Sequence, residues 1–378
     1  MTSRNNPRPL VAAVAALPVA ALVAVLLPGG TAAAAGGHGQ PGHAGSRSEP
    51  IVIGHRGASG YRPEHTLASY ELAIEQCADY LEPDLVSTAD GVLVARHENE
   101  IGGTTDVEDH PEFADRRTTK VIDGASVTGW FTEDFTYAEL STLRAEERIP
   151  QVRPANTAYD GRFAIPTLQE VIDLAQASET CDGEPVGIYP ETKHPSYFDS
   201  IGLSLEQPLV ESLEANGYTD EDDRVIVQSF EVGNLQELDA LTDVTLAQLT
   251  NCSGAPADRP GTPYAEMATR AGLRAVATYA DGVGLCKDLV IPRKADGSLG
   301  RPTRVVKDAH RAGLVAHAWT FRAENTFLPA DFRSDGGPAE HGDLVAEVRT
   351  FLRTGLDGVF SDQPDLAVQA VEGSRGRG

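Results

Sequence analysis

The chain has 378 residues, of which 56 are Asp or Glu and 31 are Lys or Arg, so its formal net charge is −25. Proteins that bind nucleic acid or anionic membranes need basic stripes, and the basic runs here are short pairs such as Arg116-Arg117, so we expect no nucleic-acid partner and no stable membrane association. The hydrophobic content of 41% and charged content of 23% exclude wholesale disorder, while the oligomeric state stays open.

The first 35 residues predict a secretory signal peptide that is cleaved near Ala35. Arg4 and Arg8 form a short basic start, the uncharged apolar run 10–27 follows, and small residues lead up to Ala35. A basic start, an apolar run and an A-x-A-like site are typical of exported proteins. The alternative is an uncleaved membrane anchor, because a run of about 18 apolar residues reaches the lower limit for a span. The small-residue site directly after the run favours cleavage and secretion.

Residues 36–49 are rich in Gly, His and Ser and predict a flexible linker. Residues 50–372 then alternate between short apolar runs and stretches with helical periodicity, which we interpret as one domain. The predicted strands are 51–54, 80–86, 186–189, 225–229, 245–249, 275–278, 314–319 and 358–360. The predicted helices include 66–78, 167–177, 205–216, 233–241, 303–312 and 344–353. This alternation predicts an α/β protein with a closed (β/α)8 TIM barrel, and an open doubly wound sheet is the main alternative.

One long stretch, at about 98–166, breaks the alternation. It contains Gly102-Gly103, Trp130-Phe131, Pro150 and Pro154, but no good crossover unit. Loops of this length without regular structure are uncommon in compact domains. We therefore expect an insertion after the second strand that lies over the mouth of the barrel.

Four cysteines remain after the signal peptide is removed, and their even number in a secreted chain predicts two disulfides. Their spacing fits no compact zinc pattern, and three pairings are possible. Cys77 ends the first predicted helix and Cys181 precedes the third predicted strand, so both lie at the bottom of the barrel. Cys252 and Cys286 follow the fifth and sixth predicted strands, at the top. The predicted pairs are Cys77–Cys181 and Cys252–Cys286.

The second predicted strand carries two carboxylates near its end. Glu82 and Asp84 are two residues apart, which places both side chains on the same face of a strand. Two carboxylates at the mouth of a barrel repel each other, and a divalent cation would offset this, with Glu191 at the end of the next strand as a third ligand. Oxygen ligands favour Ca²⁺ or alternatively Mg²⁺. A lone E-x-D more often forms an outward salt bridge, but the polar groups at neighbouring strand ends favour the metal site.

Histidines and basic residues also stand at the predicted strand ends. His55 and His97 are candidates for proton transfer, because histidine is the usual general acid or base near neutral pH. Arg56 and Lys193 bring positive charge to the same place and suit a phosphate group. A displacement at phosphorus needs one proton acceptor and one proton donor, so this set of residues predicts phosphodiester chemistry.

Several motifs at these positions can be compared with known families. They are His55-Arg56-Gly57-Ala58, Pro63-Glu64-His65-Thr66, Glu82-x-Asp84-Leu85, Asp90-Gly91-x-Leu93-Val94-x-x-His97, Tyr189-Pro190-Glu191-x-Lys193, Val227-Gln228-Ser229-Phe230, Ala318-Trp319-Thr320 and the run 355–364. Together they resemble the glycerophosphodiester phosphodiesterase family, especially its secreted or periplasmic branch. The resemblance covers nearly all of residues 50–370.

The resemblance implies a (β/α)8 barrel enzyme that hydrolyses glycerophosphodiesters, small anionic substrates, to sn-glycerol 3-phosphate and an alcohol. It implies a divalent metal on Glu82, Asp84 and Glu191, catalytic His55 and His97, a phosphate site at Arg56 and Lys193, support from Glu64, and a pocket wall with Gln228 and Trp319. Many members have His-Asp where this chain has His97-Glu98, and Glu-Asn-Thr where it has Glu64-His65-Thr66. Neither difference removes a metal ligand or a catalytic histidine.

We assign structural or secondary roles to the remaining polar residues near the predicted strand ends. We interpret His65 as a helix-start residue, His317 as part of the site wall or the core, Asp357 and Asp362 as capping or turn residues, and His194 as a lesser candidate for substrate contact. Two other functions are alternatives: a related phosphodiesterase that acts on intact lipid or a teichoic-acid-like polymer, and a non-catalytic binding protein on the same barrel. The presence of both histidines and all three carboxylates disfavours the binding protein.

Overall fold

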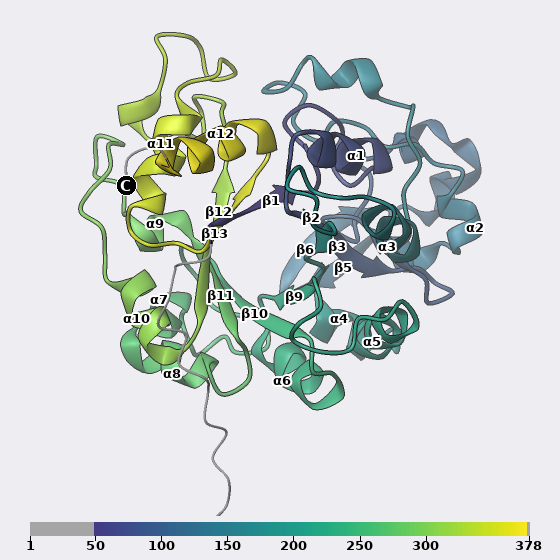
Figure 1. Ribbon diagram of the computed structural model, residues 1–378. Coiled ribbons are helices and arrows are strands. Elements are labelled where there is room, and N and C mark those ends of the chain that lie inside the picture. Colours follow the sequence, from purple (N-terminus) through teal and green to yellow (C-terminus); the bar gives the residue numbers. More distant parts are fainter. Residues whose placement is uncertain (1–48, 376–378) are drawn as a thin grey trace, which may run out of the picture. The chain divides into compact units, whose positions relative to one another are not determined.

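The structure, a computed structural model, describes residues 49–375 (Figure 1). The predicted signal peptide and almost all of the predicted linker lie outside the described residues. Within residues 49–375, no helix has both the length and the apolar character needed to cross a membrane.

A barrel of parallel strands forms the centre of the described chain (Figure 1). Two barrel strands are each interrupted once: β2 (Tyr80–Glu82) continues as β3 (Asp84–Ser87), and β7 (Gly187–Ile188) continues as β8 (Glu191–Thr192). The other strands are β1 (Ile51–His55), β9 (Ile226–Ser229), β10 (Thr245–Thr250), β11 (Gly282–Cys286), β12 (Val315–Phe321) and β13 (Gly358–Ser361). At one end of the sheet β2 pairs with β7, and at the other end β3 pairs with β8, so the sheet closes on itself. The predicted TIM-barrel fold is confirmed.

Proline accounts for both interruptions. Pro83 and Pro190 have no N–H group and cannot donate to the strand ladder. The ladder nevertheless resumes beyond each proline, since the Glu191 N–H donates to the Pro83 carbonyl at 2.9 Å. The strand direction is therefore kept across Pro83, and both Glu82 and Asp84 stay buried on the side facing the barrel.

Helices cover the outside of the barrel (Figure 1). The longer ones are α1 (Leu67–Glu75), α3 (Leu168–Gln176), α5 (Glu206–Ala215), α6 (Val232–Leu241), α8 (Arg270–Val276), α10 (Val305–Ala312), α11 (Leu344–Leu352) and α12 (Pro364–Arg375). Shorter helices are α4 (Pro195–Ser200), α7 (Tyr264–Met267), α9 (Lys287–Val290) and η5 (Ala330–Phe332). The main hydrophobic core lies between strands and helices, and a smaller cluster fills the barrel with Ile53, Tyr189, Ile226, Ala247 and Phe360.

Local sequence signals set the helix ends. The Thr167 side chain accepts from the Glu170 N–H while the Glu170 side chain accepts from the Thr167 N–H, which is a capping box at the start of α3. Helix α10 ends at Gly313, whose φ of 91° lies in the left-handed region that glycine adopts without strain. These signals explain the start of α3 and the end of α10, and each helix predicted from periodicity coincides with an observed helix.

The predicted sixth strand is wrong. The run 275–278 covers the end of α8 and the turn after it, and the sixth barrel strand is β11. A short apolar run cannot be assigned to helix or strand by periodicity, and the glycines of β11 weaken its strand signal. They are there for packing, because a Cβ on Gly282 would lie only 2.9 Å from Val315 Cγ2 and one on Gly284 would overlap Leu249.

The segment predicted as an insertion, at about 98–166, contains no crossover helix. Before it, β4 (Leu93–Ala95) pairs antiparallel with β3. Its elements are η1 (Asp106–Asp109), η2 (Pro111–Arg116), β5 (Thr118–Ile122), β6 (Ala125–Gly129), η3 (Thr132–Asp134), α2 (Tyr137–Leu140) and η4 (Asn156–Tyr159). Strands β5 and β6 form a hairpin that turns at Asp123 and Gly124, with φ values of 49° and 80°.

Both predicted disulfides are confirmed. Cys77 pairs with Cys181, and Cys252 pairs with Cys286, each with a Cα–Cα distance of 5.2 Å. The first bond joins the end of α1 to the segment before β7, across a sequence separation of 104 residues. The second joins the loop after β10 to the last residue of β11.

Candidate active site

A cavity of about 440 Å³ opens where the barrel strands end. Most residues singled out from the sequence line it: His55, Arg56, Glu82, His97, Glu191, Lys193, Gln228 and Trp319. Glu64 and Asp84 do not line the cavity, but both contact Arg56. The fold therefore gathers the whole predicted set around one cavity.

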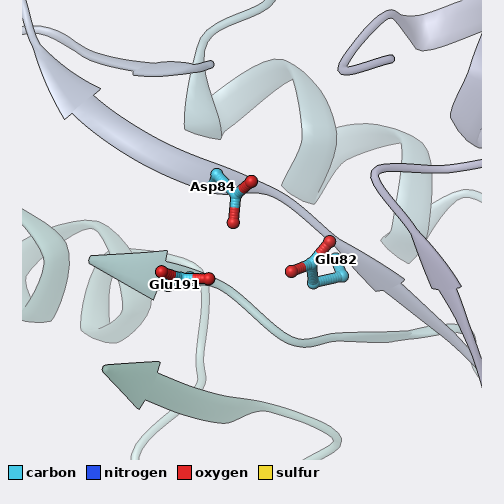
Figure 2. A group of neighbouring side chains, drawn as sticks. All are labelled: Glu82, Asp84 and Glu191. Atoms are coloured by element: carbon cyan, nitrogen blue, oxygen red, sulfur yellow. The ribbon is translucent and has the colours of Figure 1, made fainter. Parts of the chain in front are cut away.

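Glu82, Asp84 and Glu191 form a compact acidic trio (Figure 2). One carboxylate oxygen from each lies within 4.8 Å of the others, and all three side chains are buried. Burial raises the pKa of Glu82 well above its usual value, and the neighbouring Asp84 carboxylate raises it further. Burial likewise raises the pKa of Glu191 to about 8. Asp84 Oδ1 has no hydrogen-bond partner among residues 49–375. These carboxylates repel one another, and one of their oxygens lacks a hydrogen bond. Both features suit a site for a hard divalent cation.

Asp84 is oriented by His65, a contact that the sequence did not reveal. His65 Nε2 lies 2.9 Å from Asp84 Oδ2, and His65 Nδ1 lies 2.8 Å from the Tyr70 hydroxyl. His65 does precede Thr66, the N-cap of α1, as predicted for a helix-start residue. Its side chain, however, is fully buried against the acidic trio, and with Lys193 it keeps the pKa of Asp84 well below the usual range despite burial.

Arg56 and Lys193 bring positive charge directly to these carboxylates. The Arg56 guanidinium lies 3.0 Å from Glu64 and 3.3 Å from Asp84, and the Arg56 backbone N–H donates to Glu82 at 2.8 Å. Lys193 Nζ lies 3.0 Å from Glu191 Oε1. Arg56 adopts a φ of 61°, a left-handed turn at the end of β1 that directs its backbone N–H at the trio. The cavity thus presents positively charged side chains that suit an anionic substrate, next to carboxylates that suit a metal ion.

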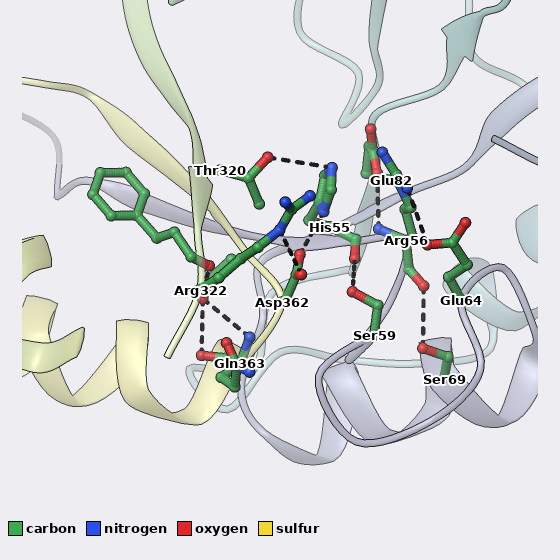
Figure 3. A network of polar contacts seen from close by, with 12 residues as sticks. His55, Arg56, Ser59, Glu64, Ser69, Glu82, Thr320, Arg322, Asp362 and Gln363 are labelled. Carbon is green, nitrogen blue, oxygen red and sulfur yellow. Dashed lines mark hydrogen bonds and ion pairs between the residues drawn. The ribbon is translucent and has the colours of Figure 1, made fainter. Parts of the chain in front are cut away.

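A carboxylate on the side away from the cavity orients the His55 ring. Its Nδ1 lies 2.6 Å from Asp362 Oδ1, and its Nε2 lies 3.4 Å from the Thr320 hydroxyl (Figure 3). Arg322 and Arg153 outweigh burial and hold the pKa of Asp362 well below the usual range, so the carboxylate stays ionised and accepts a hydrogen bond from Nδ1–H of His55. Burial, and then Arg56, lower the pKa of His55 to about 4. The Nε2 lone pair is consequently available on the cavity side.

The sequence interpretation of Asp362 as a capping or turn residue is therefore wrong. Its side chain bonds His55, and it also accepts from Arg322 Nε at 2.8 Å and from Arg153. The Asp357 side chain likewise contacts distant segments, since it accepts from the Ala316 N–H at 2.8 Å and lies 2.7 Å from His310 Nε2. Asp362 could not be recognised from sequence because its partner lies 307 residues earlier.

His97 is also held by a carboxylate, as part of a longer chain of contacts. Its Nδ1 lies 2.9 Å from Glu98 Oε1, and Glu98 Oε2 lies 2.7 Å from His194 Nε2. His194 Nδ1 lies 2.6 Å from Asp123 at the tip of the β5–β6 hairpin. Burial lowers the pKa of His97 to about 3, whereas Asp123 and Glu98 outweigh burial and raise the pKa of His194 to about 9. His194, which lines the cavity, therefore links the inserted segment to His97.

The remaining predicted residues support the cavity wall. Gln228 Nε2 donates to Glu82 Oε1 at 3.1 Å, so Gln228 positions a carboxylate of the trio. Trp319 Nε1 donates to the Gly284 carbonyl at 3.1 Å, with the indole ring edge-on to Phe230. Trp319 thus combines a packing role with a place in the wall.

His317 belongs to the core, and it supports a prediction about acid stability. Its side chain is buried against the Tyr189 hydroxyl at 3.0 Å, and burial lowers its pKa to about 4. Unfolded histidine has a pKa near 6.5, so between that pH and about 4 the unfolded chain binds a proton that the folded chain does not. This group therefore lowers the free energy of unfolding as the pH falls, by up to about 1.4 kcal/mol per pH unit.

We expect His317→Gln to reduce that pH dependence by the contribution of one proton. Urea unfolding at several pH values between 7 and 4 measures it, and His341→Gln, at an exposed loop position, is the matched control. Equal slopes in the two variants would contradict the prediction.

Comparison with known proteins gives a consistent result. A family model described as the glycerophosphoryl diester phosphodiesterase family matches residues 55–366. A glycerophosphodiester phosphodiesterase of Arabidopsis thaliana is 36% identical over 327 residues, covering 83% of this chain and 84% of the relative. One from Haemophilus influenzae is 30% identical, covering 86% and 91%.

Solved structures share the fold at lower identity. An Oleispira antarctica phosphodiesterase in complex with the product sn-glycerol-3-phosphate superposes with a TM-score of 0.55 at 22% identity, covering 86% of this chain and 97% of that one. A glycerophosphodiester phosphodiesterase from Agrobacterium tumefaciens superposes with a TM-score of 0.54 at 17% identity, covering 85% and 99%. At these identities the likeness establishes the barrel fold.

Proposed function

Because the chain belongs to the glycerophosphoryl diester phosphodiesterase family and is a phosphoric diester hydrolase, we propose that it is a secreted, metal-dependent enzyme that uses His55 and His97 as acid and base. It hydrolyses glycerophosphodiesters to sn-glycerol 3-phosphate and an alcohol. The observation that carries the proposal is one cavity lined by two carboxylate-held imidazoles, two basic side chains and carboxylates of the acidic trio.

The acidic trio would hold the metal, Ca²⁺ or alternatively Mg²⁺, whose chemistry here is to neutralise charge on the phosphate oxygens. Arg56 and Lys193 bind the same phosphate, so their charges are directed at the atoms where negative charge develops. Glu64 keeps Arg56 in place through a contact of 3.0 Å. The very acidic chain is thus locally adapted to an anionic substrate.

His55 and His97 divide the proton transfers. Each ring has a carboxylate at Nδ1, which favours a proton there and leaves Nε2 as the proton acceptor. On His55 this Nε2 faces the Thr320 hydroxyl at 3.4 Å, a long contact that a substrate would replace. One Nε2 takes the proton from the nucleophile, which is water or a neighbouring glycerol hydroxyl, and the other ring, once protonated, gives its proton to the leaving alkoxide. With pKa values of about 4 and 3 both rings are neutral in the free protein, and a bound phosphodiester anion would favour the protonated form of the donor.

Secretion is supported by two kinds of observation. The apolar run at 10–27 and the small residues up to Ala35 have the order of a cleaved export signal. The two disulfides are bonds that persist in oxidising compartments.

Turnover of glycerophosphocholine with and without EDTA tests the enzyme and its metal together. We expect formation of glycerol 3-phosphate, loss of turnover in EDTA, and recovery on addition of Ca²⁺ or Mg²⁺. Glu82→Gln should prevent recovery, whereas Glu214→Gln, at an exposed position on α5, is the matched control. Full activity in EDTA would refute metal dependence, and glycerophosphodiesters left intact while intact lipid or a teichoic-acid-like polymer is cleaved would refute the substrate class.

A further inference from the structure

A second acidic trio lies outside the active site, where α4, α5 and α6 come together (Figure 1). It consists of Asp199, Glu206 and Glu237, with one carboxylate oxygen of each within 4.8 Å of the others. None of the three lines the active-site cavity. Among residues 49–375, no Lys, Arg or His side chain forms an ion pair with any of them. The trio therefore has no positive partner within the described chain.

Glu206 is the buried member of this second trio. Its residue exposure is 1%, and its Oε1 accepts a hydrogen bond from Asn234 Nδ2 at 2.5 Å. The other oxygen, Oε2, is buried and has no hydrogen-bond partner within the described part of the chain. Asn234 cannot turn to serve both oxygens, because its own Oδ1 accepts from the Thr192 hydroxyl at 2.7 Å. A buried carboxylate oxygen without a partner is costly unless a ligand satisfies it.

The positions of these carboxylates on the helices produce unfavourable charge interactions that a bound cation would offset. Asp199 stands in the last turn of α4, where the helix dipole disfavours a negative charge. Glu206 is the first residue of α5, where the dipole is favourable. Even so, burial raises the pKa of Glu206, and Asp199 and Glu237 raise it further. The favourable helix end thus does not compensate for burial and like-charge repulsion.

Helix α6 presents two of the groups from one face. Asn234 and Glu237 are three residues apart, a spacing that places both side chains on the same side of a helix. Asn234 holds one oxygen of Glu206 while Glu237 supplies a carboxylate beside the other members of the trio. The arrangement is a buried ligand held in place, with two exposed carboxylates at its rim.

We propose that Asp199, Glu206 and Glu237 form a second, structural calcium site that ties α4, α5 and α6 together. The ligands are all carboxylate oxygens, which suit a hard cation and exclude a preference for zinc or copper. Ca²⁺ fits better than Mg²⁺, because the exposed Asp199 and Glu237 leave room for the larger and more variable coordination shell of calcium, completed by water. Binding to the folded chain alone stabilises it.

Calcium binding by the full-length protein tests this site. After removal of metal with EDTA, isothermal titration calorimetry should show one equivalent of Ca²⁺ fewer in Glu237→Gln and in Asp199→Asn than in the control Glu214→Gln. The rise in melting temperature on adding Ca²⁺ should also be smaller in these two variants than in the control.

The same number of bound ions in all three variants would overturn the proposal. Protonation of Glu206 would then explain how three carboxylates of the second trio lie so close together. Mg²⁺ that competes equally with Ca²⁺ would overturn the choice of metal. Neither readout uses turnover, so failure of the proposed catalytic function leaves this test unaffected.

Discussion

Replacing His55 by Ala is expected to lower kcat for glycerophosphocholine by about 10²–10⁴-fold, because a positioned general acid or base contributes about that much. The ring is oriented by Asp362 at 2.6 Å, so its Nε2 is presented to the cavity without reorganisation. His97→Ala has the same expected effect, because Glu98 holds that ring in the same way at 2.9 Å. Asp362→Asn should also lower kcat, since an amide that donates to Nδ1 would stabilise the other tautomer.

Steady-state kinetics with saturating divalent metal measure these effects. His341→Ala is the control, because His341 lies in an exposed loop and does not line the cavity. Melting temperatures near the wild-type value establish that the variants are folded. Near-full turnover in either His55→Ala or His97→Ala would refute the assignment of that histidine to proton transfer.

Arg153→Met is expected to lower the free energy of unfolding by about 3–5 kcal/mol, because it leaves the buried Glu324 carboxylate without its positive partner and removes one of the two arginines that contact Asp362. Arg153 comes from the inserted segment and is 5% exposed. Its Nε lies 2.6 Å from Glu324, its other nitrogens reach Asp362, and it donates to the Ser59 carbonyl at 2.9 Å. It therefore joins the insertion to the ends of three different barrel strands.

Urea unfolding at pH 7 measures the loss, with Arg259→Met as the matched control. Arg259 is half exposed, and the one ion pair it forms with residues 49–375, to Asp258, spans 4.0 Å, so its removal should cost less than about 1 kcal/mol. Equal stability of the two variants would contradict the role of Arg153. Arg153→Lys should recover only part of the loss, because a single ammonium cannot replace a planar guanidinium shared by two carboxylates.

The barrel was largely predictable because its signals are local. The parallel strands were expected from short apolar runs separated by amphipathic stretches, and α3 was expected from its periodicity at 167–177. The missed strand β11 marks the limit of such signals. Its glycines are explained by contacts with Leu249 and Val315, which are distant in sequence and adjacent only in the folded sheet.

The acidic trio at the barrel mouth was predicted by combining a local rule with a topological one. The period of two along a strand placed Glu82 and Asp84 on one face, and it holds across Pro83. Glu191 followed only from the expectation that parallel strands end at the same edge of a barrel. Its proximity to the other two is confirmed, since one carboxylate oxygen of each lies within 4.8 Å of the others, whereas the binding of a metal there stays a prediction.

By itself, the sequence determined most of the elements, the barrel class, the disulfide pairs and the residue types at the strand ends, because these depend on neighbours a few positions away or on strand order. Only the tertiary structure decided which charges meet. The His65 side chain contacts Asp84, the Asp362 side chain contacts His55, and Glu206 lies beside two carboxylates from other helices. The physical reason is that electrostatic contacts depend on distance through space and on burial, and neither is encoded by any single stretch of the chain.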